Sequence, residues 1–109
     1  MSVEKLKMSE SKLVYVHATF ELKPGTDIKA LLDPIAGPTR AEPGCIQYEF
    51  FKQENNNPEG TKYSAIECWR SAEDLQAHSK APHVQGFSAK AKQYLIAPIN
   101  LMVFKERVA

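Results

Sequence analysis

Apolar and polar residues alternate along the stretch LVYVHATFEL, from Leu13 to Leu22. One set of alternate positions holds Val14, Val16, Ala18 and Phe20, and the set between them holds Tyr15, His17, Thr19 and Glu21. An alternation with a period of two, rich in β-branched and aromatic residues, predicts a strand with two distinct faces. The sequence Lys-Pro-Gly that follows predicts the end of this strand.

A helical spacing of apolar residues comes next. Thr26 or Asp27 can cap a helix whose apolar positions are Ile28, Leu31, Leu32 and Ile35. Gly37-Pro38 is expected to break or kink this helix, because proline lacks a backbone donor and its ring clashes with the preceding turn. We expect at most one further turn before Glu42.

Two further strands are predicted on either side of a strong loop signal. The segments are Cys45–Gln53, CIQYEFFKQ, and Thr61–Arg70, TKYSAIECWR. Between them lies ENNNPEG, which concentrates the residues that favour turns. The two segments are therefore expected to form an antiparallel hairpin.

A second helical region follows the hairpin. Ser71 is a predicted N-cap, with acidic residues in the first turn, and the helix is expected to run to about Lys80. Pro82 predicts a new helix start, and Pro98 the end of that helix. The apolar face of the new segment is Val84, Phe87, Ala91 and Tyr94 or Leu95, and Ile99–Arg107 is the last predicted strand.

The predicted order, β-α-β-β-α-β, is typical of a ferredoxin-like α+β fold with an antiparallel sheet. Helices on one side of such a sheet leave its other side uncovered. Residues that point to opposite faces are nevertheless both apolar in the pairs Phe50 and Phe51, Tyr63 and Ile66, and Met102 and Val103. A second sheet, most simply that of an identical subunit, would cover the open side, so we expect a homodimer.

Composition narrows the possible partners. The chain has 109 residues and a formal net charge of +1, with no basic stripe, so neither nucleic acid nor an anionic membrane is an expected partner. No apolar run approaches the length of a membrane helix. Cys45 and Cys68 are expected to be reduced thiols in a cytoplasmic protein. Residues 1–11 are expected to be a flexible tail, and residues 12–109 a single domain.

Several fragments together resemble the antibiotic biosynthesis monooxygenase family. They are the Pro-Gly after the first strand, EPGCIQYEFF, the strand ending in ECW, EDLQAHSKAPHVQGF and a late Ala-Pro, and they span roughly Leu13 to Lys105. The resemblance implies a dimeric α+β barrel that oxygenates a quinol- or phenol-like aromatic substrate with O2, without metal, flavin or any other cofactor. Relatives that degrade haem are set aside, because Ala18, His78 and Ser88 do not match their residues.

His78, Trp69 and Tyr48 are the candidate catalytic residues. His78 lies one helical turn after Leu75 and suits a general base, because its unperturbed pKa is near neutrality. Trp69 could stack on a planar substrate, and Tyr48 could hydrogen-bond a substrate oxygen. For each residue a purely structural role is the alternative: a helix-end histidine bonded to backbone, a core tryptophan and a cross-strand aromatic pair.

Glu67, Phe50, His83 and Phe87 are the candidate substrate-binding residues. Glu67 shares a strand face with Trp69, and a buried carboxylate needs a partner, such as Arg40, Arg70 or a histidine. His83 could close the mouth of the pocket or simply pack at the helix start. Phe50 and Phe87 would form apolar walls together with Trp69, and we place Phe50 and Tyr48 on one strand face with Ile46.

No metal site is predicted. His78 and His83 are five residues apart, across a proline, and no third ligand is in evident register. Two other functions remain open. One is isomerisation of a phosphorylated hydroxyketone, since isomerase relatives share the AH…PH portion, with Lys80 or Lys90 for the phosphate. The other is a non-catalytic dimer that binds a small apolar ligand.

Overall fold

The structure, a computed structural model, describes residues 12–54 and 58–109. The predicted N-terminal tail and the centre of the loop between the second and third strands therefore lie outside the described residues. The elements are β1 (Val14–Leu22), α2 (Ile28–Arg40), β2 (Cys45–Lys52), β3 (Thr61–Trp69), α3 (Ala72–Lys80), α4 (Pro82–Ala91) and β4 (Asn100–Phe104). Their order confirms the predicted succession of strands and helical regions.

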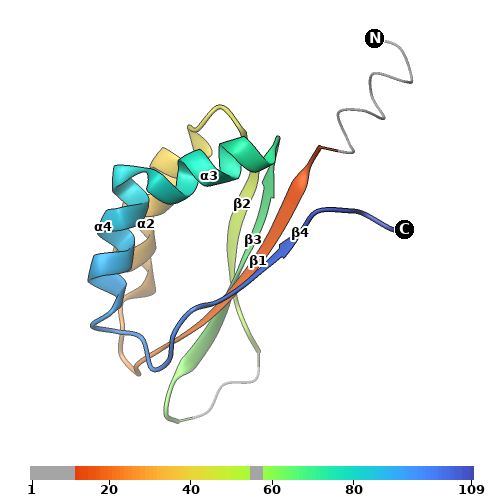
Figure 1. The fold of residues 1–109 in the computed structure, drawn as a ribbon. Helices are drawn as coiled ribbons and strands as arrows, with labels where there is room; N and C mark the ends of the chain where they lie inside the picture. Colours follow the sequence, from red (N-terminus) through yellow and green to blue (C-terminus); the bar gives the residue numbers. More distant parts are fainter. Residues whose placement is uncertain (1–11, 55–57) are drawn as a thin grey trace.

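The four strands form one antiparallel sheet in the order β2-β3-β1-β4. Helices α2, α3 and α4 all lie on the same side of it, and the opposite side is open (Figure 1). In the register, Ala18 pairs with Ala65, and Tyr48 pairs with Glu67. The predicted ferredoxin-like α+β fold is confirmed, with the split arrangement that places β3 between β1 and β2.

The apolar core lies between the sheet and the helices. Every second residue of β1 is buried there, as the alternation along this strand predicts. The core has two clusters: one contains Phe20, Leu22, Leu31, Leu32, Ile35, Tyr63 and Ala91, and the other contains Val14, Val16, Tyr48 and Trp69. Phe50 is half-buried and packs against both clusters, so it connects them.

Helix α2 begins at Asp27, one of the two predicted caps, and continues past the predicted break. The carboxylate of Asp27 accepts a hydrogen bond from the N–H of Ala30 at 3.1 Å. Of the predicted break or kink at Gly37-Pro38, a break is wrong, because the helix continues through Pro38 to Arg40, an end that agrees with one further turn before Glu42. The buried face explains why: Leu31, Leu32, Ile35, Ala36 and Thr39 form one stripe against the sheet. Burial of this stripe outweighs the local cost of proline.

The second helical region follows the prediction closely until its end. The hydroxyl of Ser71 accepts a hydrogen bond from the N–H of Asp74 at 3.1 Å, which confirms the predicted cap. Helix α4 stops at Ala91, so the expected continuation to Tyr94 or Leu95 is wrong. The chain there turns back to the end of β1, where Leu95 forms a bridge with Leu22. After one further hydrogen-bonded turn, the N–H of Lys23 donates to the carbonyl of Tyr94, and the N–H of Ile96 donates to the carbonyl of Glu21.

One residue of β2 does not lie on its expected face. The pairing of β2 with β3 shifts register between Cys45 and Gln47, so Ile46 is bulged out of the ladder. Its side chain is 57% exposed, whereas Tyr48 is 5% exposed. The prediction that Ile46 shares a buried face with Tyr48 and Phe50 is therefore wrong.

Large apolar side chains remain exposed on the open side of the sheet. Pairing with His17 and Tyr15 places Met102 and Phe104 there, and both are more than one-third exposed. Phe51, on β2, pairs with Ser64 and is half exposed. Among the described residues, no helix is long and apolar enough to cross a membrane.

Candidate active site

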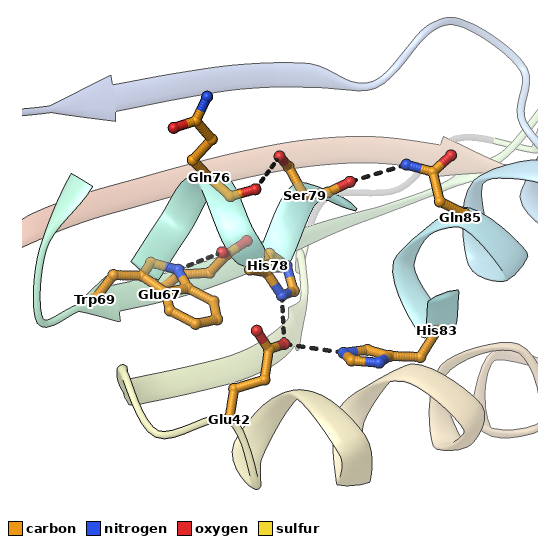
Figure 2. A network of polar contacts seen from close by, with 8 residues as sticks. All are labelled: Glu42, Glu67, Trp69, Gln76, His78, Ser79, His83 and Gln85. Carbon is orange, nitrogen blue, oxygen red and sulfur yellow. Dashed lines mark hydrogen bonds and ion pairs between the residues drawn. The ribbon is translucent and has the colours of Figure 1, made fainter. Parts of the chain in front are cut away.

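Four buried polar or aromatic side chains meet where α3 crosses the end of the sheet. They are Tyr48 from β2, Glu67 and Trp69 from β3, and His78 from α3, and none is more than 7% exposed. Figure 2 shows that Glu67, Trp69 and His78 lie close to one another beneath α3. The structure therefore brings together all three candidate catalytic residues and one of the candidate substrate-binding residues.

Trp69 and Glu67 are two residues apart on β3 and consequently share a face of the strand. The indole N–H of Trp69 donates to Oε1 of Glu67 at 2.9 Å (Figure 2). Burial raises the pKa of the Glu67 carboxyl, and the hydrogen bond from Trp69 and the proximity of His78 oppose that shift. Burial is the largest of these effects, so the pKa of Glu67 stays above its ordinary value.

Among the residues that the structure describes, no arginine pairs with Glu67, contrary to one of the sequence-based alternatives. Arg40 donates its Nε–H to the backbone carbonyl of Tyr48 at 2.9 Å. Arg70 forms an exposed, two-bond pair with Asp74 near the start of α3. Both guanidinium groups therefore have other hydrogen-bond partners, and the Trp69 indole satisfies the carboxylate instead.

His78 lies in the last turn of α3 and is buried against aromatic rings. Its ring centroid is 4.5 Å from that of Trp69 and 5.6 Å from that of Tyr48. Its Nδ1 is 2.7 Å from Oε2 of Glu42. Because an ionised carboxylate only accepts hydrogen bonds, the ring proton is placed on Nδ1. Within residues 12–54 and 58–109 no hydrogen bond to Nε2 is present, so that nitrogen is available as a proton acceptor.

Glu42 also contacts the second histidine. Nε2 of His83 is 2.9 Å from the same Oε2 atom, so one carboxylate oxygen lies between two imidazoles (Figure 2). We call these three residues the Glu42 triad. Sequence reasoning missed Glu42, although it belongs to the EPG turn that precedes β2. Its separation from His78 and His83, 36 and 41 residues, carries no local periodic signal.

The joint between α3 and α4 is held by its own hydrogen bonds. The N–H of Ala81 donates to the carbonyl of His78 at 3.0 Å. The side chain of Gln85 donates to the carbonyl of Ser79 at 2.9 Å, and the Ser79 hydroxyl donates to the carbonyl of Gln76 at 2.7 Å (Figure 2). These bonds fix the start of α4, and with it His83, relative to His78.

The hydroxyl of Tyr48 is a hydrogen-bond donor throughout the neutral pH range. Burial, followed by the charge of Glu67, raises its pKa above the ordinary value of 10.0. Thr39 approaches it from α2, but Oγ1 of Thr39 is fully buried and makes no hydrogen bond with any described residue. Tyr48 thus presents a neutral phenol beside the His78 ring.

Of the remaining candidates, only Phe50 lies at the edge of this cluster. Phe50 meets Tyr48 edge to face at 5.1 Å between centroids, and it also lines an open groove of about 400 Å³ between α2 and β2. Phe87 is half-buried and packs on the neighbouring apolar cluster, so it does not join the catalytic candidates directly. Lys80 and Lys90, the phosphate candidates of the isomerase alternative, are both exposed.

Comparisons with known proteins agree with the fold and the sequence fragments. The family model described as "Antibiotic biosynthesis monooxygenase" matches residues 13–90. A Mycobacterium tuberculosis protein named "Putative monooxygenase Rv0793" is 32% identical over 76 residues, which cover 70% of this chain and 71% of that protein. The uncharacterized protein sll1783 of Synechocystis is 29% identical over 104 residues, covering 94% of this chain and 68% of that protein.

Solved structures have the same architecture. The structure of Rv0793 has a TM-score of 0.78 and 29% identity, covering 89% of this chain and 97% of that one. PA3566 from Pseudomonas aeruginosa has a TM-score of 0.75 and 25% identity, covering 90% and 96% respectively. The match of the family model over most of the sequence, together with these likenesses, shows that the chain belongs to the antibiotic biosynthesis monooxygenase family.

Proposed function

We propose that this protein is a monooxygenase that inserts one atom of O2 into a quinol- or phenol-like aromatic substrate. The observation that carries the proposal is the hydrogen-bonded pair of Glu42 and His78, buried against the rings of Trp69 and Tyr48. A carboxylate that holds one imidazole nitrogen leaves the other nitrogen oriented as a proton acceptor. The names of the relatives support a monooxygenase role in general, and the substrate class is our inference.

The reaction is balanced by the substrate and oxygen alone. A quinol and one O2 give a hydroxylated quinone and one water, so the substrate supplies all the electrons that reduce oxygen. Nε2 of His78 takes the phenolic proton, which makes the ring electron-rich enough to pass an electron to O2. Carbon–oxygen bond formation follows, and the O–O bond breaks as one oxygen atom leaves in water. The protein contributes positioning, deprotonation and exclusion of water.

Each candidate residue has a role in this proposal. Tyr48, kept neutral by burial, donates a hydrogen bond to the substrate oxygen next to His78. Trp69 and Glu67 support the His78 ring from the sheet side, with Trp69 as the stacking surface. Phe50 encloses the substrate at the edge of the cluster, and Phe87 does so from the neighbouring apolar cluster. His83 holds Glu42 in place.

A homodimer is part of the proposal. Met102 and Phe104 are 38% and 48% exposed on the side of the sheet that none of the described helices covers. Burying such a patch against the same patch of a second copy is favourable, because apolar area leaves water in both subunits. The open side of the sheet is then the interface, and each subunit keeps its own His78 site on the helix side.

Oxygen uptake with a panel of hydroquinones and anthrone-like phenols tests the oxygenase proposal. Purified protein in the presence of a chelator is expected to consume oxygen, whereas boiled protein is not. Replacing His78 with Gln, which keeps much of the side-chain volume, is expected to lower the rate by about 10²- to 10⁴-fold, the usual contribution of a general base.

His17→Gln is the matched control, because His17 lies on the opposite face of the sheet and contacts Ser64 at 3.0 Å. It is expected to keep the wild-type rate. Far-UV circular dichroism of both variants checks that the fold is intact. An unchanged rate in a folded His78→Gln protein would remove His78 from the scheme. The absence of protein-dependent uptake with every substrate in the panel would contradict the oxygenase proposal itself.

A further inference from the structure

We propose that the Glu42 triad is a binding site for one divalent transition-metal ion. Its three side chains offer two imidazole nitrogens and one carboxylate oxygen, a donor set that suits Zn²⁺ and the neighbouring transition metals. His78 and His83 alone are too few ligands for a metal site, and Glu42 supplies the third ligand from a turn that is distant in the sequence. Solvent or substrate would occupy the remaining coordination positions.

The distances within the triad are close to those of a metal site. Oε2 of Glu42 is 2.7 Å from Nδ1 of His78 and 2.9 Å from Nε2 of His83, and all the ligand atoms lie within 4.8 Å of one another. Tetrahedral ligands at about 2.1 Å from a metal are about 3.4 Å apart. The carboxylate oxygen would therefore move away from each imidazole, and the two imidazoles toward each other, by side-chain rotation as an ion replaces the two hydrogen-bond protons.

Electrostatics favours a cation at this position. The carboxyl groups of Glu42 and Glu67 both lie near the His78 ring, so two acidic groups share one partly buried region (Figure 2). Within the described part of the chain, neither carboxylate forms an ion pair with lysine or arginine. The side chains of Glu42 and His83 are 17% and 19% exposed, which leaves a path from solvent, whereas that of His78 is 9% exposed.

Backbone hydrogen bonds fix the positions of the three ligand residues, which lowers the entropy cost of ordering their side chains around an ion. The N–H of Glu42 donates to the carbonyl of Thr39 at 3.0 Å, and its own carbonyl accepts from the N–H of Cys45 at 3.0 Å. His78 lies in the last turn of α3 and His83 in the first turn of α4, and the N–H of Ala81 between the two helices donates to the carbonyl of His78. The site is therefore preformed on three rigid segments.

Metal binding does not depend on the proposed oxygenase activity, but a bound metal would change that activity. A metal ion on Nδ1 of His78 places the ring proton on Nε2, and that nitrogen can then no longer accept a proton. If the proposed function is correct, the metal-bound form is the less active one, and a chelator raises the rate of oxygen uptake.

Isothermal titration of tag-free, chelator-treated protein with Zn²⁺ and with Co²⁺ tests the site. One ion is expected to bind per subunit. Glu42→Gln and His83→Gln are each expected to weaken binding at least about tenfold, since changes even to groups behind the ligands have effects of that size. His17→Gln removes the third histidine of the chain, which lies outside the triad, and is expected to bind as the wild type does.

A second measurement uses only the wild type, so it tests the site even if the variants fail to fold. Paramagnetic Co²⁺ is expected to broaden the imidazole NMR signals of two histidines and to spare that of His17. Wild-type binding no tighter than that of the triad variants, or equal broadening of all three signals, would overturn the proposal and leave the triad as a hydrogen-bonded clamp. Because both readouts measure binding, their failure is distinct from a failure of the oxygenase assay.

Discussion

Replacing Trp69 with Phe tests whether the Trp69–Glu67 hydrogen bond holds the site together. The indole is fully buried, and its N–H is the donor to Oε1 of Glu67 at 2.9 Å. Loss of a hydrogen bond to a charged acceptor costs about 1.5–3 kcal/mol. The smaller ring also leaves about 40 Å³ unfilled, which costs about 1 kcal/mol. We therefore expect the free energy of unfolding to fall by about 2.5–4 kcal/mol.

Urea unfolding followed by far-UV circular dichroism measures this change. Fluorescence is unsuitable, because Trp69 is the only tryptophan of the chain. Protein concentration must be the same for all variants, since unfolding of a dimer depends on it. A double-mutant cycle separates the two contributions: in a Glu67→Met background there is no carboxylate to leave unpaired, so Trp69→Phe should cost only about 1 kcal/mol. An equal cost in both backgrounds would show that packing alone explains the effect.

Three further variants test other parts of the structure. Gly44→Ala should lower the free energy of unfolding in urea by about 1–3 kcal/mol, because the added Cβ would overlap the side chain of Asp74. Gly37→Ala is the matched control: its Cβ would meet no atom within 4 Å, so the change should be neutral or stabilising. The folded state raises the pKa of Glu67 above its ordinary value of 4.5, so the wild type should lose stability as pH rises from 4.5 through the raised pKa. Glu67→Gln cannot ionise and should become more stable relative to the wild type over this window, as measured by unfolding at a series of pH values. Phe104→Lys should dissociate the proposed dimer in light scattering, and an unchanged mass would contradict the proposed interface.

The elements were predictable from the sequence because each has a strong local signal. Period-two alternation in β1, the Ser71 cap and the Pro82 start all depend on neighbouring residues. The errors occurred where tertiary contacts outweigh local preference. Burial of Thr39 beyond Pro38 keeps α2 helical, and pairing of Leu95 with Leu22 ends α4 early. Neither contact can be found by reading a window of sequence.

The candidate site was predicted in part for the same reason. Trp69 and Glu67 share a strand face by alternation, and His78 was expected on the buried side of α3, so these residues follow from local periodicity. No local periodicity predicts the position of Glu42, because Glu42 reaches the histidines only through the length and direction of α2. Had the helix ended at Gly37, the turn that carries Glu42 would have started elsewhere, since each helical residue advances the chain by about 1.5 Å.

The same reasoning explains how two histidines five residues apart can share one carboxylate. In a continuous helix, residues at that spacing point about 140° apart around the axis, so His78 and His83 would face different neighbours. Ala81 is instead extended, with φ −66° and ψ 145°, as expected of a residue that precedes a proline. The chain thus changes direction between the two imidazoles, and both reach Oε2 of Glu42. Pro82, which the sequence marks only as a helix start, is therefore the residue that makes the Glu42 triad geometrically possible.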